Sequence, residues 1–266
     1  MNLQCTKIRT GTLEYYLRQR KNADTVVFVH GLGANLEQFA KQCDYFDNRF
    51  QVLILNLSGH GSSQSIRPFD LASCAQDIIY LLDALNIDKV HYVGNSMGGN
   101  IGFEILASFE HRLHSLTTFG TTGELNTSII ATKALGTMYR ILPISLIANL
   151  ASTSGRNKGS KHSIKTMMRQ MDRQTILTII PVLASFNYLE VIESSQVPLL
   201  LIKGEHDVDI NKSLPSTLAR LEKRNNTNVI ELKGVGHFAN LDAPEQFNVI
   251  LESFLQTVAT TYYKES

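Results

Sequence analysis

The stretch Gly94-Asn95-Ser96-Met97-Gly98 decides how the rest of this sequence is interpreted. It follows the short apolar run 90–93 and precedes the helix-compatible run 99–109. A strand, a sharp turn and a helix around a G-x-S-x-G sequence form a nucleophile elbow, in which the turn lifts the serine hydroxyl clear of the backbone. The glycines are needed because so tight a turn leaves no room for β-carbons beside the serine. Ser96 is therefore a candidate nucleophile.

Two further motifs follow in the chain. Gly204-Glu205-His206-Asp207 comes after one predicted strand, and Gly234-Val235-Gly236-His237-Phe238 comes after the next. An isolated match to G-x-S-x-G is weak evidence, but serine, then aspartate, then histidine is the chain order expected of a catalytic triad built around such an elbow. The order and the context together make Ser96, Asp207 and His237 the candidate triad.

A fourth motif lies upstream, where the apolar strand 25–29 runs into His30-Gly31-Leu32-Gly33. With this motif, and with the stretch 56–62 after the following strand, the sequence resembles the α/β-hydrolases over nearly all of its length. The resemblance implies an α/β fold with a mostly parallel, doubly wound sheet, helices on both faces and an inserted helical cap. The serine at the elbow argues against haloalkane dehalogenases and epoxide hydrolases, which use an aspartate there.

The triad residues have complementary chemical roles. A serine hydroxyl is a weak nucleophile at neutral pH, so His237 would remove its proton during attack. Asp207 would accept a hydrogen bond from the other ring nitrogen and stabilise the imidazolium that forms. Glu205 and Asp209 share the loop with Asp207, but only Asp207 has the spacing from the loop glycine that the family shows.

Two backbone amides would hold the negative oxygen of a tetrahedral intermediate. One is that of Met97, directly after the nucleophile. The resemblance assigns the other to Leu32, with Gly33 as the alternative. The sequence departs from the common family pattern at Asn95, where a histidine often precedes the serine, and at 56–59, which replaces Asp-Leu-Pro-Gly. Neither departure removes a catalytic group.

Composition narrows the function classes. The 266 residues are 43% hydrophobic, and 25 Lys and Arg against 24 Asp and Glu give a net charge of +1, so no global field favours nucleic acid or an anionic membrane. The three cysteines are widely spaced and odd in number, which predicts reduced thiols. No apolar leader and no run long enough to cross a bilayer occur, so we expect a cytoplasmic protein. No metal cluster, phosphate loop or dinucleotide fingerprint is present, so no cofactor and no metal are expected.

The rest of the chain shows a βα rhythm, opened by a hairpin over residues 4–19. It is interrupted between Thr121 and Ile192, which is predicted to be helical with no intervening strand. We therefore expect a core domain at 1–121 and 192–266 and a cap segment at 122–191. Strands are predicted near 25–29, 51–56, 89–94, 115–119, 198–203 and 227–232. Helices are predicted at about 35–46, 71–86 with Asp70 as N-cap, 97–109, 214–224 with Pro215 in the first turn, and 244–258.

The cap segment divides chemically. Residues 138–150 are apolar and can either pack on the core or line a substrate pocket, whereas 154–173 is basic and suits a solvated face. The candidate substrate-binding residues are His30, Phe238, Met138 and Leu142. The basic residues also suit an acidic acyl carrier protein as partner; they are Arg156, Lys158, Lys161, Lys165, Arg169 and Arg173.

The leading hypothesis is a serine hydrolase that cleaves carboxylic esters of small molecules through an acyl-enzyme on Ser96. The same triad also serves lactonases, thioesterases and carbon–carbon bond hydrolases, so the fold does not choose the bond. A narrower alternative is an esterase for carrier-bound acyl methyl esters. A different class is a sensor that keeps a slow hydrolase site. Acyl and alcohol preference, oligomeric state and the docking of the cap cannot be read from the sequence.

Overall fold

The computed structural model describes residues 3–8, 11–65 and 68–265. Its main feature is a nine-stranded sheet in the order β1-β2-β4-β3-β6-β7-β10-β11, with β5 paired to β2. The strands of this sheet are β1 (Gln4–Ile8), β2 (Gly11–Arg18), β3 (Thr25–Val29), β4 (Gln51–Leu55), β5 (Gln64–Ser65), β6 (Val90–Asn95), β7 (Leu113–Phe119), β10 (Leu199–Gly204) and β11 (Thr227–Leu232).

The sheet is parallel from β4 to β11 and antiparallel where β1 and β2 join it. The strands predicted from continuous apolar runs are all present, and the opening hairpin is formed by β1 and β2. Every residue of β3 and β6 is buried, as expected of central strands covered on both faces. The predicted α/β fold class is therefore confirmed.

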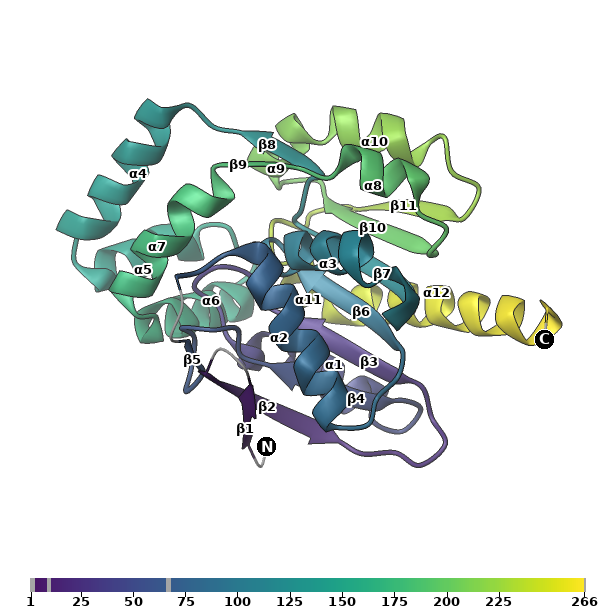
Figure 1. The fold of residues 1–266 in the computed structure, drawn as a ribbon. Helices are drawn as coiled ribbons and strands as arrows, with labels where there is room; N and C mark the ends of the chain where they lie inside the picture. Colours follow the sequence, from purple (N-terminus) through teal and green to yellow (C-terminus); the bar gives the residue numbers. More distant parts are fainter. Residues whose placement is uncertain (1–2, 9–10, 66–67, 266) are drawn as a thin grey trace.

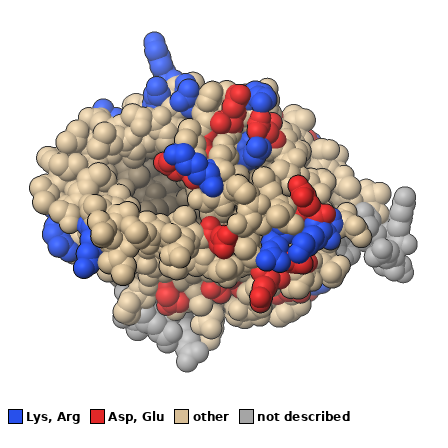
Figure 2. Space-filling view, turned by 90° about the horizontal axis from the view of Figure 1, so that it is seen from above, with Lys and Arg blue, Asp and Glu red and all other residues tan. Residues whose placement is uncertain are grey.

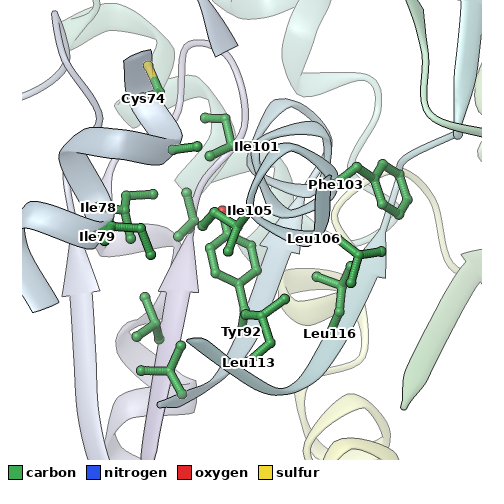
Figure 3. Packing of buried hydrophobic residues seen from close by; sticks show 14 of the residues in the cluster. Cys74, Ile78, Ile79, Tyr92, Ile101, Phe103, Ile105, Leu106, Leu113 and Leu116 are labelled. Carbon is green, nitrogen blue, oxygen red and sulfur yellow. The ribbon is translucent and has the colours of Figure 1, made fainter. Parts of the chain in front are cut away.

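Helices cover both faces of the sheet (Figure 1). Alternate residues of β3 belong to different cores: Val27 packs in the cluster that contains α2 and α3, and Phe28 packs in the cluster that contains α1 and α12. Figure 3 shows part of the first cluster, with Tyr92 and Leu116 of the sheet against Ile105 of α3. The helices that precede residue 122 or follow residue 188 are α1 (Ala40–Phe46), α2 (Leu71–Ala84), α3 (Met97–Ser108), α8 (Leu189–Ser194), α9 (Val208–Ser213), α10 (Pro215–Leu221), α11 (Ala239–Asp242) and α12 (Pro244–Glu265), with 3₁₀ turns η1 (Leu36–Phe39) and η2 (Glu110–Arg112).

The predicted helices of the core are present with corrected ends. Asp70 accepts a hydrogen bond from the Ser73 amide and caps α2, and Pro215 is the first residue of α10. Helix α12 extends to Glu265 rather than ending near residue 258, and α10 ends at Leu221 rather than 224. Helices α9 and α11 were not predicted because turns of six and four residues are too short to show a 3.6-residue period.

The prediction of no strand between Thr121 and Ile192 is wrong. Strands β8 (Glu124–Asn126) and β9 (Ser185–Asn187) pair antiparallel in a separate sheet and bring the two ends of the insertion together. Three residues are too few for an alternating pattern to be recognised in the sequence. The helices between these strands are α4 (Ile129–Ile141), α5 (Ile144–Ser152), α6 (Lys158–Gln170) and α7 (Arg173–Leu183).

Arg173 has a structural role in this insertion. Its guanidinium donates hydrogen bonds to the carbonyls of Arg140 and Leu142 at the end of α4, where the last carbonyls of a helix lack internal partners. Pro143 separates α4 from α5.

The cysteines in the structure are free thiols, and burial raises the pKa of Cys43 to about 11. In the part of the chain that the structure describes, no helix is long and apolar enough to span a membrane.

Candidate active site

Ser96 lies in the sharp turn between β6 and α3, where its backbone has φ 52° and ψ −119°. A positive φ is rare for a residue other than glycine and indicates a strained turn, as in a nucleophile elbow. The two flanking glycines are explained by close backbone packing. A Cβ on Gly94 would lie 2.4 Å from the carbonyl oxygen of Gly98, and a Cβ on Gly98 would lie 2.3 Å from that of Val29. The elbow therefore packs α3 directly against β6 and β3.

The structure brings Asp207 and His237 together. Asp207 follows β10 and His237 follows β11, and the His237 Nδ1–H donates a hydrogen bond to Asp207 Oδ2 at 2.9 Å. The side chain of Asp207 is 8% exposed and that of His237 is 22% exposed, so the carboxylate is shielded while the ring reaches an accessible space. The rival acids lie elsewhere: Glu205 accepts from the Gly234 amide, and the Asp209 side chain is 98% exposed.

Asn95 connects the elbow to the loop between β11 and α11 that carries His237, called here the histidine loop. Its side-chain amide donates to the backbone carbonyls of His237 at 3.2 Å and Phe119 at 3.1 Å. Among the hydrogen bonds of the described chain, none joins the Ser96 hydroxyl to His237. The link between Ser96 and His237 thus runs through the residue directly before Ser96.

Asn95 belongs to a buried row of side-chain amides. Gln38 Nε2 donates to Asn95 Oδ1 and to Asn240 Oδ1, and Asn240 in turn donates to Gln42. Gln42 continues the row to Asn248 in α12. Hydrogen bonds between buried side chains restrict their relative positions, and this row ties the elbow to the loop that carries His237. The row has no signature in the sequence, because amides on η1, α1, α11 and α12 have no recognisable spacing.

The two candidate oxyanion donors are backbone amides without a protein partner in the described residues. In the described residues, neither the Leu32 amide nor the Met97 amide has a hydrogen-bond partner within the protein, whereas the Gly33 amide donates to His60 Nε2 at 3.3 Å. The Gly33 amide is therefore already hydrogen-bonded, and the Leu32 amide is the better candidate for the second oxyanion donor. A Cβ on Gly31 would lie 3.0 Å from the Ser96 Cβ, so this loop packs directly against the candidate nucleophile.

Two buried histidines support that loop. His30 donates from Nδ1 to the Gly31 carbonyl and accepts at Nε2 from the Leu57 amide, so both ring nitrogens are used beneath the loop. His60 donates to the Ser58 carbonyl and lies 4.8 Å from His30 between ring centroids. Burial lowers the pKa of His60 to about 4 and that of His30 well below its usual range. Both rings are therefore neutral near pH 7, as accepting an amide hydrogen bond requires.

The remaining candidate substrate residues fall into two apolar groups. Met138 and Leu142 of the insertion pack against the same apolar cluster as Leu32, which belongs to the loop 30–33 after β3. Phe238, which is 6% exposed, packs with Ile164 in a second apolar cluster. Its ring meets the His237 ring edge-on, with 5.2 Å between the ring centroids. Figure 2 shows a hollow in the face seen from above, on the side where α4, α5 and α7 lie in Figure 1, with mostly uncharged residues around its visible rim.

Asp242 joins the insertion to the histidine loop and was not singled out from the sequence. One carboxylate oxygen accepts from the Gly236 amide at 2.9 Å, and the other accepts from the Arg156 amide at 2.7 Å. A Cβ on Gly236 would lie 2.4 Å from the carbonyl oxygen of Ser154. The histidine loop is thus packed against the segment that leads into α6.

No group of three or more His, Cys, Asp or Glu side chains is arranged to hold a metal ion within the residues that the structure describes. His91 lies in β6 with 2% exposure and hydrogen-bonds to Ser115.

Comparisons with known proteins agree with this architecture. Residues 24–143 match the family model described as alpha/beta hydrolase fold. The chain is 24% identical to 3-oxoadipate enol-lactonase 1 of Acinetobacter baylyi, with 97% of this chain and 98% of that protein covered. Its structure resembles the enol-lactonase of Burkholderia xenovorans LB400, with a TM-score of 0.85, 19% identity, and coverage of 95% of this chain and 100% of that one. It also resembles a thermophilic esterase of Thermogutta terrifontis, with a TM-score of 0.84, 21% identity, and coverage of 96% of this chain and 99% of that one.

Proposed function

The chain has the α/β-hydrolase fold, and on that premise we propose that it is a serine hydrolase that cleaves carboxylic esters through an acyl-enzyme on Ser96. The observation that carries the proposal is the Asp207–His237 hydrogen bond beside the strained elbow of Ser96. The enzyme relatives named as enol-lactonase and esterase support the reaction class.

In the proposed reaction, His237 removes the Ser96 proton while the serine oxygen attacks the ester carbonyl carbon. Asp207 holds the proton on Nδ1, which leaves Nε2 as the base. The Leu32 and Met97 amides, which lack protein partners in the described residues, stabilise the negative oxygen of the tetrahedral intermediate. The alkoxide leaves with the proton from His237, and water activated by the same ring then releases the acid.

We propose that residues 122–191 act as a cap over this site. The pairing of β8 with β9 makes the insertion leave and re-enter the core at one place, and Met138 and Leu142 meet Leu32 in one apolar cluster. The acyl or alcohol group of the substrate would lie against these side chains, because Leu32 also carries a proposed oxyanion donor. We expect the protein to act in the cytoplasm, in keeping with its free thiols.

A lactone is the second candidate substrate class. Its support is the similarity to an enol-lactonase over nearly the full length of both chains. A lactone is a cyclic ester, so the acyl-enzyme chemistry is the same and only the leaving group remains attached. The site geometry does not favour thioesters or carbon–carbon bonds over these two classes.

The structure reduces the number of basic residues that can be used to test the carrier-protein alternative. Of the six basic residues that motivate it, Arg173 binds backbone carbonyls of α4, so charge reversal there would disturb the fold rather than test a partner. Arg156, Lys158, Lys161 and Arg169 are exposed and remain suitable for such a test. The sensor alternative predicts ligand binding with negligible turnover.

A panel of p-nitrophenyl esters and aliphatic lactones tests the proposal, with wild type compared with Ser96→Ala. Turnover of either class that disappears in the variant supports the proposal, and the chain-length optimum measures pocket depth. Equal turnover by both proteins would contradict it. Absence of turnover together with ligand-dependent hydrogen-exchange protection of residues 122–190 would favour the sensor.

A further inference from the structure

The outer face of α4 is apolar and exposed, and the proposed active site does not use it. Ile129, Ile130 and Ile141 are 74%, 82% and 70% exposed, which makes them more exposed than the other large hydrophobic residues of the described chain. Single exposed apolar residues are normal on a protein surface, but here Ile129 and Ile130 in the first turn of α4 and Ile141 at its last position expose both ends of one helix.

Two cations lie on the same face. At 100° per residue, Ile129, Lys133 and Arg140 fall within about 40° of one another, and Ile130 and Ile141 follow on the adjoining side. Lys133 and Arg140 are both exposed. The opposite side of the helix is used for packing, since the buried Tyr139 joins the apolar cluster of the insertion and α4 contacts α7. We call Ile129, Ile130, Lys133, Arg140 and Ile141 the α4 outer face.

The chain from α4 onward contains no carboxylate until Asp172, which caps α7. No Asp or Glu occurs between residues 125 and 171, and none of the cations in that range forms an ion pair within the described chain. The segment is therefore strongly positive although the whole chain has a net charge of only +1. Its cations are Lys133, Arg140, Arg156, Lys158, Lys161, Lys165 and Arg169.

The position of α4 leaves its outer face accessible. Figure 1 places α4 at the edge of the molecule, beyond α7 and away from the sheet. The helix is held at both ends, by the Ser128 cap at its start and by Arg173 at its last carbonyls, so the exposed isoleucines are presented on a fixed helix.

We propose that the α4 outer face docks on the surface of a membrane that contains anionic lipids. An interfacial helix combines an apolar face that enters the headgroup region with Lys and Arg that meet anionic lipid, and the α4 outer face has both features. The docked molecule would present the cap segment, with its apolar cluster of Met138 and Leu142, to amphipathic esters held in the bilayer. This inference goes beyond the proposed reaction and does not depend on it.

The charge pattern favours a bilayer over two other occupants. A second copy of the chain would bring one positive face against another, because the carboxylate-free segment repels itself. An acidic protein would satisfy the cations, but three isoleucines exposed by 70% or more are better matched by a hydrocarbon boundary than by a charged surface.

Co-sedimentation of the full-length protein with vesicles tests the proposal. We expect binding to phosphatidylcholine vesicles that contain phosphatidylglycerol, weaker binding to phosphatidylcholine alone, and loss of binding when salt is raised from about 0.1 M to about 1 M. Lys133→Gln with Arg140→Gln should weaken the partition coefficient about 25-fold, at roughly five-fold per charge. Ile129→Ser with Ile130→Ser should weaken it at least about ten-fold.

The controls come from the same chain. Val249→Ser removes an apolar side chain that is 59% exposed on α12, and Lys21→Gln removes an exposed cation between β2 and β3, and neither should change binding. Ser96→Ala should bind vesicles as wild type does, so docking is tested separately from the proposed hydrolase reaction.

Three outcomes would overturn the proposal. They are equal binding to neutral and anionic vesicles, a concentration-dependent dimer abolished by Ile129→Ser with Ile130→Ser in a protein that binds no vesicles, and binding to an acidic acyl carrier protein in the absence of vesicle binding.

Discussion

His237 Nδ1 lies 2.9 Å from Asp207 Oδ2, and this bond sets which ring nitrogen of His237 is free to act as a base. The carboxylate accepts, so the proton is on Nδ1. The ring itself comes from a loop after β11, whereas the carboxylate comes from the loop after β10. Neighbouring parallel strands thus supply the two groups.

Asp207→Asn should lower kcat by about 10⁴-fold, because an amide in that place favours the wrong tautomer of the ring while leaving its shape unchanged. The measurement is steady-state turnover of an ester that the wild-type protein cleaves. Asp209→Asn is the matched control, since that side chain is 98% exposed. A variant at Asp207 with nearly normal kcat would remove the carboxylate from the mechanism.

Asn95→Asp should lower kcat about ten-fold or more with a smaller change in KM, because it removes both donors that hold the His237 and Phe119 carbonyls. A role limited to stability would instead lower the melting temperature with kcat preserved. Asn149→Asp, an exposed amide on α5, controls for the added charge. Proportional loss of active protein with normal kcat per folded molecule would contradict positioning by Asn95.

His60→Gln should flatten the acid dependence of stability. Burial lowers the pKa of His60 to about 4, so below its usual value of 6.5 the unfolded chain binds a proton that the folded chain does not. The stability contributed by neutral His60 is thus present above pH 6.5 and lost as pH falls toward 4, by about 3 kcal/mol in total. Urea unfolding at pH 7.5 and 4.5 measures it. His91 titrates in both proteins and cancels, whereas the pKa of His30 should rise when the neighbouring His60 is removed, which flattens the acid dependence further. Parallel losses in wild type and variant would refute the assignment.

Gly94→Ala and Gly136→Ala should change stability in opposite directions. A Cβ on Gly94 would lie 2.4 Å from a backbone oxygen, so we expect a loss of about 3 kcal/mol or more. A Cβ on Gly136, within α4, meets nothing within 4 Å, so the substitution should stabilise the helix by about 1 kcal/mol. Denaturant midpoints measure both, and a tolerated Gly94→Ala would mean that the elbow is less tightly packed than described.

The sheet and its helices could be predicted because strands such as β3 and β6 are continuous apolar runs that are buried on both faces. The chain order of Ser96, Asp207 and His237 gave the candidate triad because each residue follows a recognisable strand. Features that depend on three-dimensional contacts could not be predicted. The amide row through Gln38, the occupation of the Gly33 amide by His60 and the role of Arg173 in α4 all join residues far apart in the chain.

The exposed isoleucines of α4 illustrate the same limit. The run 138–150 is apolar in the sequence and was expected to pack on the core or line a pocket, yet Ile141 is 70% exposed while Ile147 is 2% exposed. Hydrophobicity alone does not say which side of a helix faces its neighbours, since the arrangement of α4 to α7 decides it.

The most direct test of the central claim is intact-mass analysis after exposure to a fluorophosphonate, which reacts much faster with an activated serine than with an ordinary hydroxyl. The account predicts one adduct on wild type, located at Ser96 by peptide mapping, a much slower reaction for Asp207→Asn and no adduct on Ser96→Ala. An adduct on another serine, or an unmodified wild-type protein, would contradict it.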